Sequence, residues 1–155
     1  MYVFLPSTIP ALARLLEEGR LEGVPLTAFA ADPGPDEDVE EAEYEAMYAA
    51  AGESLALLAA DSGAPRRRVV LAADMPDQVV ERAGRAGRGV VRVRVTGTVP
   101  LKKLASAHVD DADAVADVAA AVQDPGSGAV EDHELMWFAV QELRYLVEET
   151  STTRP

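Results

Sequence analysis

The amino-acid sequence predicts an α/β domain in which one mixed sheet of about five strands is flanked by about four helices, with an α+β arrangement as the alternative. Short apolar runs typical of strands alternate with segments of helical periodicity in the first half of the chain. The later strand candidates follow one another closely, which favours a mixed sheet over a purely parallel one. The 155 residues can bury roughly 70% of their unfolded surface in one core, so we expect a single domain over residues 1–149 and a polar tail over 150–155.

The N-terminal segment predicts a strand followed by a helix. The apolar and aromatic run at residues 2–5 ends at Pro6, which has no backbone N–H to donate to a neighbouring strand. Ser7 or Thr8 is expected to cap the helix, because a side-chain oxygen there accepts hydrogen bonds from the first free amides. The apolar face of this helix has four residues at helical spacing before Gly19: Ile9, Leu12, Leu15 and Leu16.

A second strand and a long helix follow. Residues 26–30 form the strand candidate, and a loop with Pro33 and Pro35 separates it from the helix. The helix is expected to end near Gly63, and its apolar residues recur at helical spacing. Its first turns carry five acids, which the helix dipole favours at that end: Asp36, Glu37, Asp38, Glu40 and Glu41.

Two further strands are predicted in the middle of the chain. Residues 69–73 are uninterruptedly apolar, the pattern of a strand covered on both faces. Residues 91–95 alternate valine with arginine, so one face should be buried and the other should display guanidinium groups. Between these strands we expect a short helix over 77–83 and a flexible basic loop over 84–89.

A short strand over 105–109 and two helices complete the predicted fold. The first of these helices is expected to begin at Asp110 or Asp111 and to run to about Gln123. The second is expected to be capped by Asp132. Its apolar face would consist of Leu135, Phe138, Ala139, Leu143 and Leu146.

The charges of the chain are unevenly distributed. The segment from Arg66 to Lys103 holds ten of the 14 basic residues and three acids, so it carries +7 while the remainder carries −20. The net charge of −13 and the lack of an aromatic residue in the basic segment argue against nucleic-acid binding. No apolar run is long enough for a membrane span or a signal peptide, so we expect a cytoplasmic protein without a membrane partner.

The segregated charge favours a non-enzymatic protein-interaction or regulatory module. Its contact surface would be a basic, arginine-bearing strand face with Arg92 and Arg94, joined by Arg85 and Arg88 from the preceding loop. Trp137 is a further candidate, because its aromatic neighbour in a helix would point about 100° away and both rings could not face one core. The expected partner is another protein or a second copy of the chain. The competing interpretation is that these arginines neutralise the chain's own acidic helix.

The alternative hypothesis is a small-ligand or metal-dependent enzyme. His108, Asp110 and Asp111 lie where a predicted strand ends, and imidazole and carboxylate groups bind divalent metals. His133, the other histidine, would have to converge with them in the fold. The competing structural interpretation is that the aspartates cap a helix and the histidines are packing or surface residues.

Other chemistries have little support in the sequence. The chain has no cysteine, which excludes disulfides and thiolate metal sites. It contains neither a GxSxG nucleophile elbow nor a GxxxxGK[ST] phosphate loop. We therefore expect no cofactor and favour a protein that is not an enzyme.

Four segments carry a resemblance to a known family. They are the start from Tyr2 to Pro6, the run from Arg66 to Asp74, the segment from Val109 to Asp113, and the predicted helix over 133–143. Together they resemble a family of small, acidic, uncharacterised actinobacterial proteins, a domain of unknown function. The resemblance covers most of the chain and implies an actinobacterial cytoplasmic origin, with no assigned activity, cofactor or catalytic residue.

Overall fold

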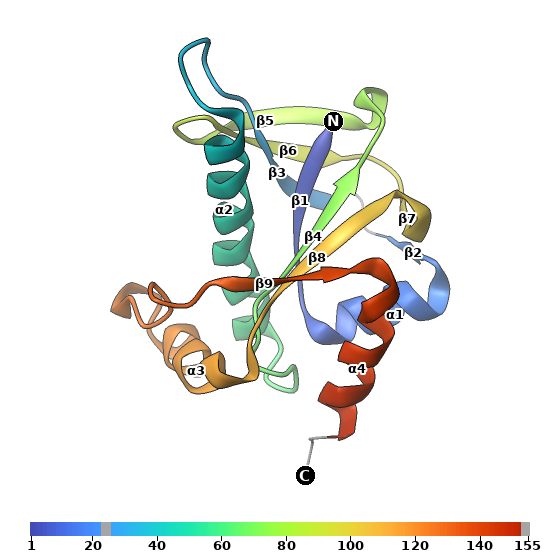
Figure 1. The fold of residues 1–155 in the computed structure, drawn as a ribbon, viewed down its shortest axis with the longest axis vertical. Helices are drawn as coiled ribbons and strands as arrows, with labels where there is room; N and C mark the ends of the chain where they lie inside the picture. Colours follow the sequence, from blue (N-terminus) through green and yellow to red (C-terminus); the bar gives the residue numbers. More distant parts are fainter. Residues whose placement is uncertain (23–25, 153–155) are drawn as a thin grey trace.

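The computed structural model describes residues 1–22 and 26–152 (Figure 1). Its main element is a seven-stranded sheet of order β5-β6-β3-β1-β4-β8-β9, in which every neighbouring pair is antiparallel. A separate small sheet pairs β2 with β7. The strands are β1 (Tyr2–Ser7), β2 (Arg20–Leu21), β3 (Leu26–Ala31), β4 (Val69–Asp74), β5 (Val80–Gly87), β6 (Val90–Val95), β7 (Val99–Pro100), β8 (Leu104–Asp110) and β9 (Leu135–Ala139).

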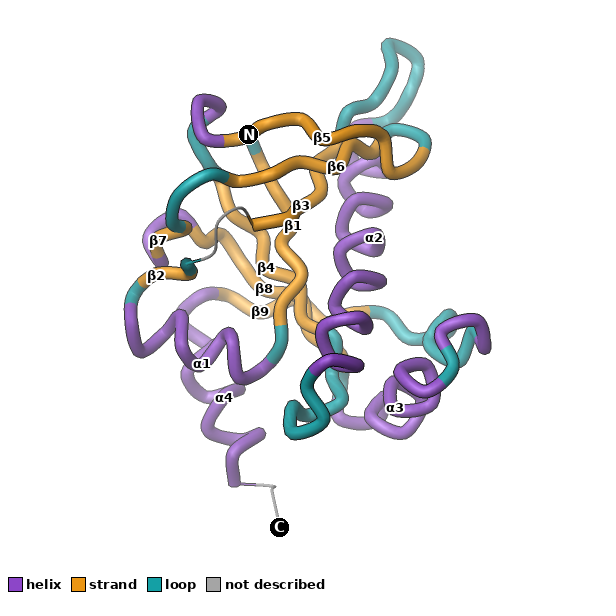
Figure 2. The backbone as a smooth tube through the Cα atoms, turned by 180° about the vertical axis from the view of Figure 1, so that it is seen from behind, coloured by secondary structure: helices purple, strands orange, loops and turns teal. Residues whose placement is uncertain are grey.

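Four α-helices in the described part of the chain cover both faces of the main sheet, as predicted. They are α1 (Ile9–Glu18), α2 (Val39–Ala60), α3 (Val115–Gln123) and α4 (Leu143–Thr152). Helix α2 packs on one face, whereas α1 and α4 lie side by side over the other (Figure 1 and Figure 2). Helix α3 packs against the last turns of α2 through Leu58 and Val118. None of the helices in the described residues is long and apolar enough to cross a membrane.

Helix α1 forms where local signals predict it. The Thr8 hydroxyl accepts a hydrogen bond from the amide of Ala11 at 3.2 Å, which satisfies one of the free amides of the first turn. Gly19 ends the helix with φ of 77°, a left-handed conformation that glycine adopts without a steric cost. The predicted cap and end of this helix are therefore confirmed.

The central strands β1 and β4 bury both of their faces. Val3, Leu5 and Leu71 point toward α1 and α4, while Phe4 and Val70 point toward α2. This alternation follows from the period of two in a strand. Burying each large apolar side chain contributes about 1.5–3 kcal/mol, so these two strands hold the layers together. The predicted two-sided burial of residues 69–73 is confirmed.

The prediction of a mixed sheet with about five strands is wrong in two respects. Strands β3 and β4 run in the same direction, but β1 lies between them and is antiparallel to both. Two further strands, β5 and β9, come from segments that the sequence analysis predicted as a short helix with a loop and as part of the last helix. As a result the main sheet has seven strands and no parallel pair.

Strand β5 replaces most of the predicted short helix and basic loop. Only Asp77–Val79 is helical, as a single 3₁₀ turn. Residues 80–87 pair with β6 in a hairpin whose register is interrupted between Arg82 and Arg85. Gly84 lies in this interruption with φ of 112°, so its glycine allows a bulge in the strand. The glycine-rich composition marks a bulged edge strand here.

Strand β9 replaces the first half of the predicted last helix. Residues 135–139 are all apolar, so no polar position reveals whether the period is two or 3.6. In the structure Phe138 packs toward α1 and α4, and Leu135 packs toward α2, as alternate residues of a strand do. Pairing with β8 decides between the two periods.

Helix α4 begins only at Leu143, which is buried together with Leu146. It runs on to Thr152, into the segment predicted as a polar tail. Thr150 is buried, and its hydroxyl donates a hydrogen bond to the carbonyl oxygen of Leu146 at 2.8 Å. Residues 153–155 of that segment lie outside the described residues.

Candidate functional site

The arginines of the predicted contact surface have two different environments. Arg92 faces α2, with its guanidinium carbon 5.3 Å from the ring centroid of Phe29 and Nη2 at 3.7 Å from the carboxylate of Glu53. Arg88, in the turn between β5 and β6, donates a hydrogen bond to Glu37 at 3.2 Å. These two arginines join the sheet to α2 and to the loop before it.

Arg85 on β5 and Arg94 on β6 remain exposed. Neither guanidinium group has a hydrogen bond or an ion pair with any residue in the described ranges 1–22 and 26–152. A third exposed arginine nearby, Arg82, pairs with Asp32 at 2.9 Å. Only part of the arginine-bearing face is therefore neutralised within the molecule.

Asp110 is fully buried and bound by arginine. Its Oδ2 accepts hydrogen bonds from Nε and from the main-chain amide of Arg68, both at 2.8 Å, and its Oδ1 accepts one from Nη2 at 2.9 Å. The main-chain oxygen of Asp110 accepts a further bond from Nε of Arg67 at 2.8 Å. Two-point binding by a guanidinium is the strongest arrangement for a carboxylate, so Asp110 acts as a structural residue between β4 and β8.

The side chains of the other candidate ligands are not directed at Asp110, although the carbonyl oxygen of His133 accepts a hydrogen bond from Nη2 of Arg68 at 3.2 Å. Asp111 is exposed, at the start of a 3₁₀ turn over Ala112–Ala114, and its side chain forms no capping hydrogen bond. His133 lies in the loop before β9, with Nε2 at 2.6 Å from Oδ2 of Asp117 on α3. Across the described residues, no group of three or more His, Asp or Glu side chains is arranged to hold a metal ion.

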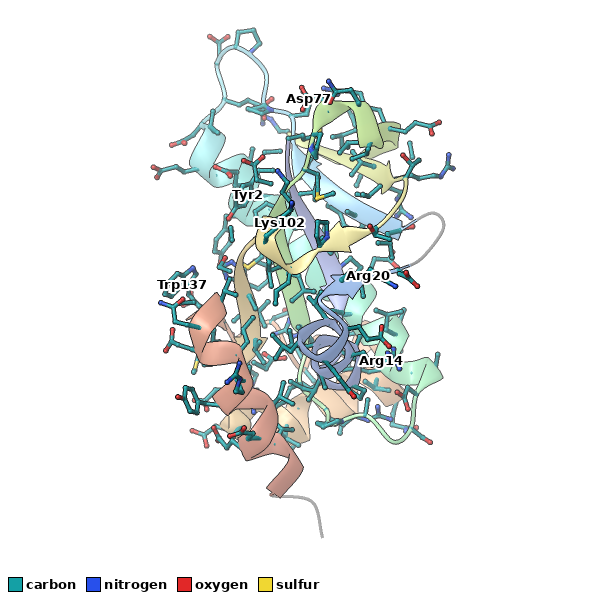
Figure 3. The ribbon with its side chains drawn as sticks, turned by 90° about the vertical axis from the view of Figure 1, so that its right-hand side faces the viewer. Tyr2, Arg14, Arg20, Asp77, Lys102 and Trp137 are labelled. Atoms are coloured by element: carbon teal, nitrogen blue, oxygen red, sulfur yellow. The ribbon has the colours of Figure 1, made fainter. Side chains whose placement is uncertain are left out.

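His108 lies in a groove between α2 and the β8–β9 end of the sheet. We call this site the aromatic groove, and its cavity volume is about 330 Å³. Figure 3 shows Tyr2 and Trp137 on the same side of the molecule, with Trp137 projecting outward. The groove is lined by Tyr2 and Phe4 of β1, Glu40, Glu43, Tyr44 and Met47 of α2, Ser106 and His108 of β8, and Trp137 of β9.

Trp137 is the most exposed large hydrophobic side chain of the groove, with 61% of its surface accessible. Tyr44 is 50% and Tyr2 is 37% accessible. The three rings come from three different elements, β9, α2 and β1, and border the same hollow. Exposed aromatic side chains gathered at one place are typical of binding surfaces.

Tyr48 connects α2 to β9 next to the groove. Its hydroxyl accepts a hydrogen bond from the amide of Leu135 at 3.1 Å. Its ring centroid lies 4.8 Å from that of Tyr44, which is one helical turn earlier, so Tyr48 also helps to position the exposed Tyr44 ring. Burial raises the pKa of the Tyr48 hydroxyl further above neutral pH.

His108 forms part of the floor of the groove. It pairs in register with Trp137 across β8 and β9, and its ring centroid lies 6.5 Å from that of Phe4. Burial lowers the pKa of the His108 imidazole because desolvation disfavours the charged form. The floor of the groove is therefore uncharged at neutral pH.

Strand β9 is an edge of the sheet, and both ends of its outer side are occupied. The amide of Leu135 donates to Tyr48, and the amide of Ala139 donates to the carboxylate of Glu142 at 2.8 Å. Since alternate residues of a strand direct their amides to the same side, the amide of Trp137 also faces outward. The free part of this edge is thus centred on Trp137.

Sequence reasoning singled out Trp137 and His108 for different hypotheses, and the structure brings them into one site. The sequence analysis did not identify Tyr2 and Tyr44 as site residues. Two patterns could have indicated these rings: Tyr44 and Tyr48 are four residues apart on a helix, and Tyr2 alternates with Phe4 in a strand. Neither pattern shows by itself that the helix and the strands share a groove.

Comparison with known proteins gives a family but no function. No curated protein and no solved structure was found to match the chain. The family model DUF6912, described as a family of unknown function, matches residues 1–147. This match covers nearly the whole chain, so the chain belongs to the DUF6912 family of unknown function.

Proposed function

We propose that this protein is a non-enzymatic, cytoplasmic protein-interaction module whose main contact surface is the aromatic groove. The observation that carries the proposal is the convergence of Tyr2, Tyr44 and Trp137, from three elements, on one open hollow. Tryptophan and tyrosine supply a large contact area with few rotatable bonds, which is why they dominate the energetics of protein interfaces.

The position of the groove favours a segment of another protein as its occupant. It borders the free part of the β9 edge, so an extended segment could place a side chain in the groove and a main-chain group beside Trp137. A second copy is a poorer candidate, since two chains that each carry −13 repel one another. We therefore favour a different protein over self-association.

The arginine-bearing face is a second candidate contact surface. Arg85 and Arg94 are exposed near the opposite edge of the sheet, and neither guanidinium forms an ion pair with an acid among the described residues, although Glu81 is the cross-strand neighbour of Arg94. Arginines without an internal partner can guide an acidic surface of a partner toward this edge. Arg88 and Arg92 would contribute less, because Glu37 and Glu53 already neutralise them.

A small-ligand site, with or without enzymatic activity, is the second candidate function. The observation that favours it is the half-buried, neutral His108 in a hollow of about 330 Å³, near the lower limit for small-molecule sites. Ser106 lies two residues away on the same strand face and also lines the hollow.

A single experiment distinguishes a protein partner from a small ligand. Trp137 is the only tryptophan of the chain, so protein labelled with 5-fluorotryptophan gives one ¹⁹F signal that reports on the groove. We expect this signal to shift or broaden in the macromolecular fraction of a cell lysate and to stay unchanged in the ultrafiltrate. A change in the ultrafiltrate alone would favour the small-ligand function.

Two variants test whether the change is specific to the groove. Tyr44→Ala removes a ring from the wall and should abolish the change in the ¹⁹F signal. Met136→Ala is the matched control, because Met136 is 40% exposed but alternates with Trp137 and so belongs to the other face of β9. An equal response of all three proteins would contradict the proposed contact surface.

A further inference from the structure

We propose that the aromatic groove receives a positively charged side chain, an arginine or a lysine, from a basic segment of the partner protein. This inference rests on the proposed function and names the chemistry of the occupant. It depends on the charges that line the groove, on its aromatic walls, and on a similar arrangement elsewhere on the same face of the sheet.

The charges of the groove are acidic and unneutralised. Glu40 and Glu43 of α2 line it, and no lysine or arginine does. Within the described ranges, neither glutamate has a hydrogen bond or an ion pair to its carboxylate. Two free carboxylates beside an uncharged floor attract a cation and disfavour an acidic occupant.

The walls of the groove offer the surfaces that cations prefer. The faces of tryptophan and tyrosine carry negative potential and attract guanidinium or ammonium groups placed over them. Trp137 and Tyr44 are both at least half exposed, so part of each ring is accessible to an occupant. An aromatic wall together with carboxylates fits a cationic group better than a purely apolar one.

The molecule already contains this type of contact. Arg92 lies over the Phe29 ring and beside Glu53, so an aromatic residue of the sheet and a glutamate of α2 hold one arginine between them. Phe29 and Phe4 are Cα partners in neighbouring strands, and Phe4 lines the groove on this same face. Nearer the start of α2, the groove repeats the aromatic residues and the helix glutamates but contains no arginine. The missing component is the cation that the partner would supply.

The test uses the emission of Trp137 and a pair of peptides that differ only in charge. A capped oligoarginine peptide should change the emission saturably, whereas its citrulline counterpart, which keeps the shape but loses the charge, should not. The double variant Glu40→Gln/Glu43→Gln should weaken binding of the arginine peptide at least about fivefold.

The matched control is Glu41→Gln/Glu45→Gln. It removes the same charge from the same helix at two exposed positions that do not line the groove, so binding should stay within about twofold of wild type. Equal weakening by both double variants would mean nonspecific attraction to an acidic protein and would overturn the proposal. Equal binding of the citrulline peptide, or no binding of either peptide, would also overturn it.

The failure of this inference is distinguishable from the failure of the proposed function. A lysate ¹⁹F response that depends on Tyr44 but survives Glu40→Gln/Glu43→Gln would leave the interaction module standing without a cationic occupant. Sedimentation velocity of the free protein gives the remaining check. Self-association that the double variant abolishes would make the occupant an arginine of a second copy and would contradict the assignment to a different protein.

Discussion

His108 and Trp137 face each other as Cα partners across β8 and β9. The only tryptophan of the chain therefore lies beside the only histidine that lines the aromatic groove. A change of charge on this imidazole must alter the field at the indole ring. The fluorescence of Trp137 can therefore report the protonation of His108.

We expect the emission of Trp137 to titrate with an apparent pKa below about 6.5, the ordinary value for histidine. Burial of His108 lowers its pKa, and the carboxylates that line the groove with it are those of Glu40 and Glu43 on α2. Fluorescence measured against pH checks this. His108→Gln should remove the transition and His133→Gln should retain it; a transition that follows His133 would contradict the assignment.

Burial of His108 should also make folding stability depend on pH. Below about pH 6.5 the unfolded chain binds a proton at this histidine more readily than the folded chain does, so wild type loses stability as the pH falls. His108→Gln should lose less stability than wild type between about pH 7 and about pH 5. Urea denaturation of both proteins at each pH gives the difference between their free energies of unfolding. The contributions of carboxyl groups present in both proteins cancel in this difference. A difference that does not vary with pH would refute the expectation.

The buried pair of Arg68 and Asp110 should be strongly coupled. Asp110→Ala leaves a buried guanidinium without its carboxylate, and we expect a loss of about 3–5 kcal/mol in the free energy of unfolding. Replacing both residues should cost much less than the sum of the two single losses, because no charge is then left unpaired. Asp32→Ala is the surface control: the side chains of Arg82 and Asp32 are 57% and 35% exposed, so the loss should be below about 1 kcal/mol.

Tyr48→Phe should loosen the connection between α2 and β9. The substitution keeps the ring but removes the acceptor for the amide of Leu135, at a cost of about 1 kcal/mol. Hydrogen exchange should accelerate at Leu135 while the amide of Phe138, on the β8 side of the strand, stays protected. Tyr145→Phe, at a 70% exposed position on α4, is the control and should change neither quantity. Unchanged exchange at Leu135 in Tyr48→Phe would count against the hydrogen bond as a restraint on the groove.

Elements whose boundaries depend on local chemistry were predictable from the sequence. Thr8 and Gly19 define α1 by capping, and the apolar run at 69–73 favoured a strand buried on both faces. β5 and β9 were not predictable, because pairing with β6 and β8 decides their structure against their composition. Long-range pairing overrides weak local preference at such positions.

The candidate site was predictable only in part. Trp137 and His108 were singled out, yet their meeting depends on the pairing of β8 with β9, which no local pattern contains. Tyr2 and Tyr44 join them because β1 lies next to β4 in the sheet and α2 crosses this face. Asp110 was a candidate ligand, and its burial against Arg68 depends on the register of β4 with β8.

The occupied outer amides of β9 also bear on how the protein behaves at high concentration. An open edge of apolar residues is a template on which further strands can add, and it leads to aggregation. Here the hydroxyl of Tyr48 and the carboxylate of Glu142 take the amides at both ends of that edge, so an incoming strand finds fewer free amides than a fully open edge would offer. The exposed Trp137 therefore lies at this rim beside a strand edge that is only partly open, and selectivity is left to the side chains.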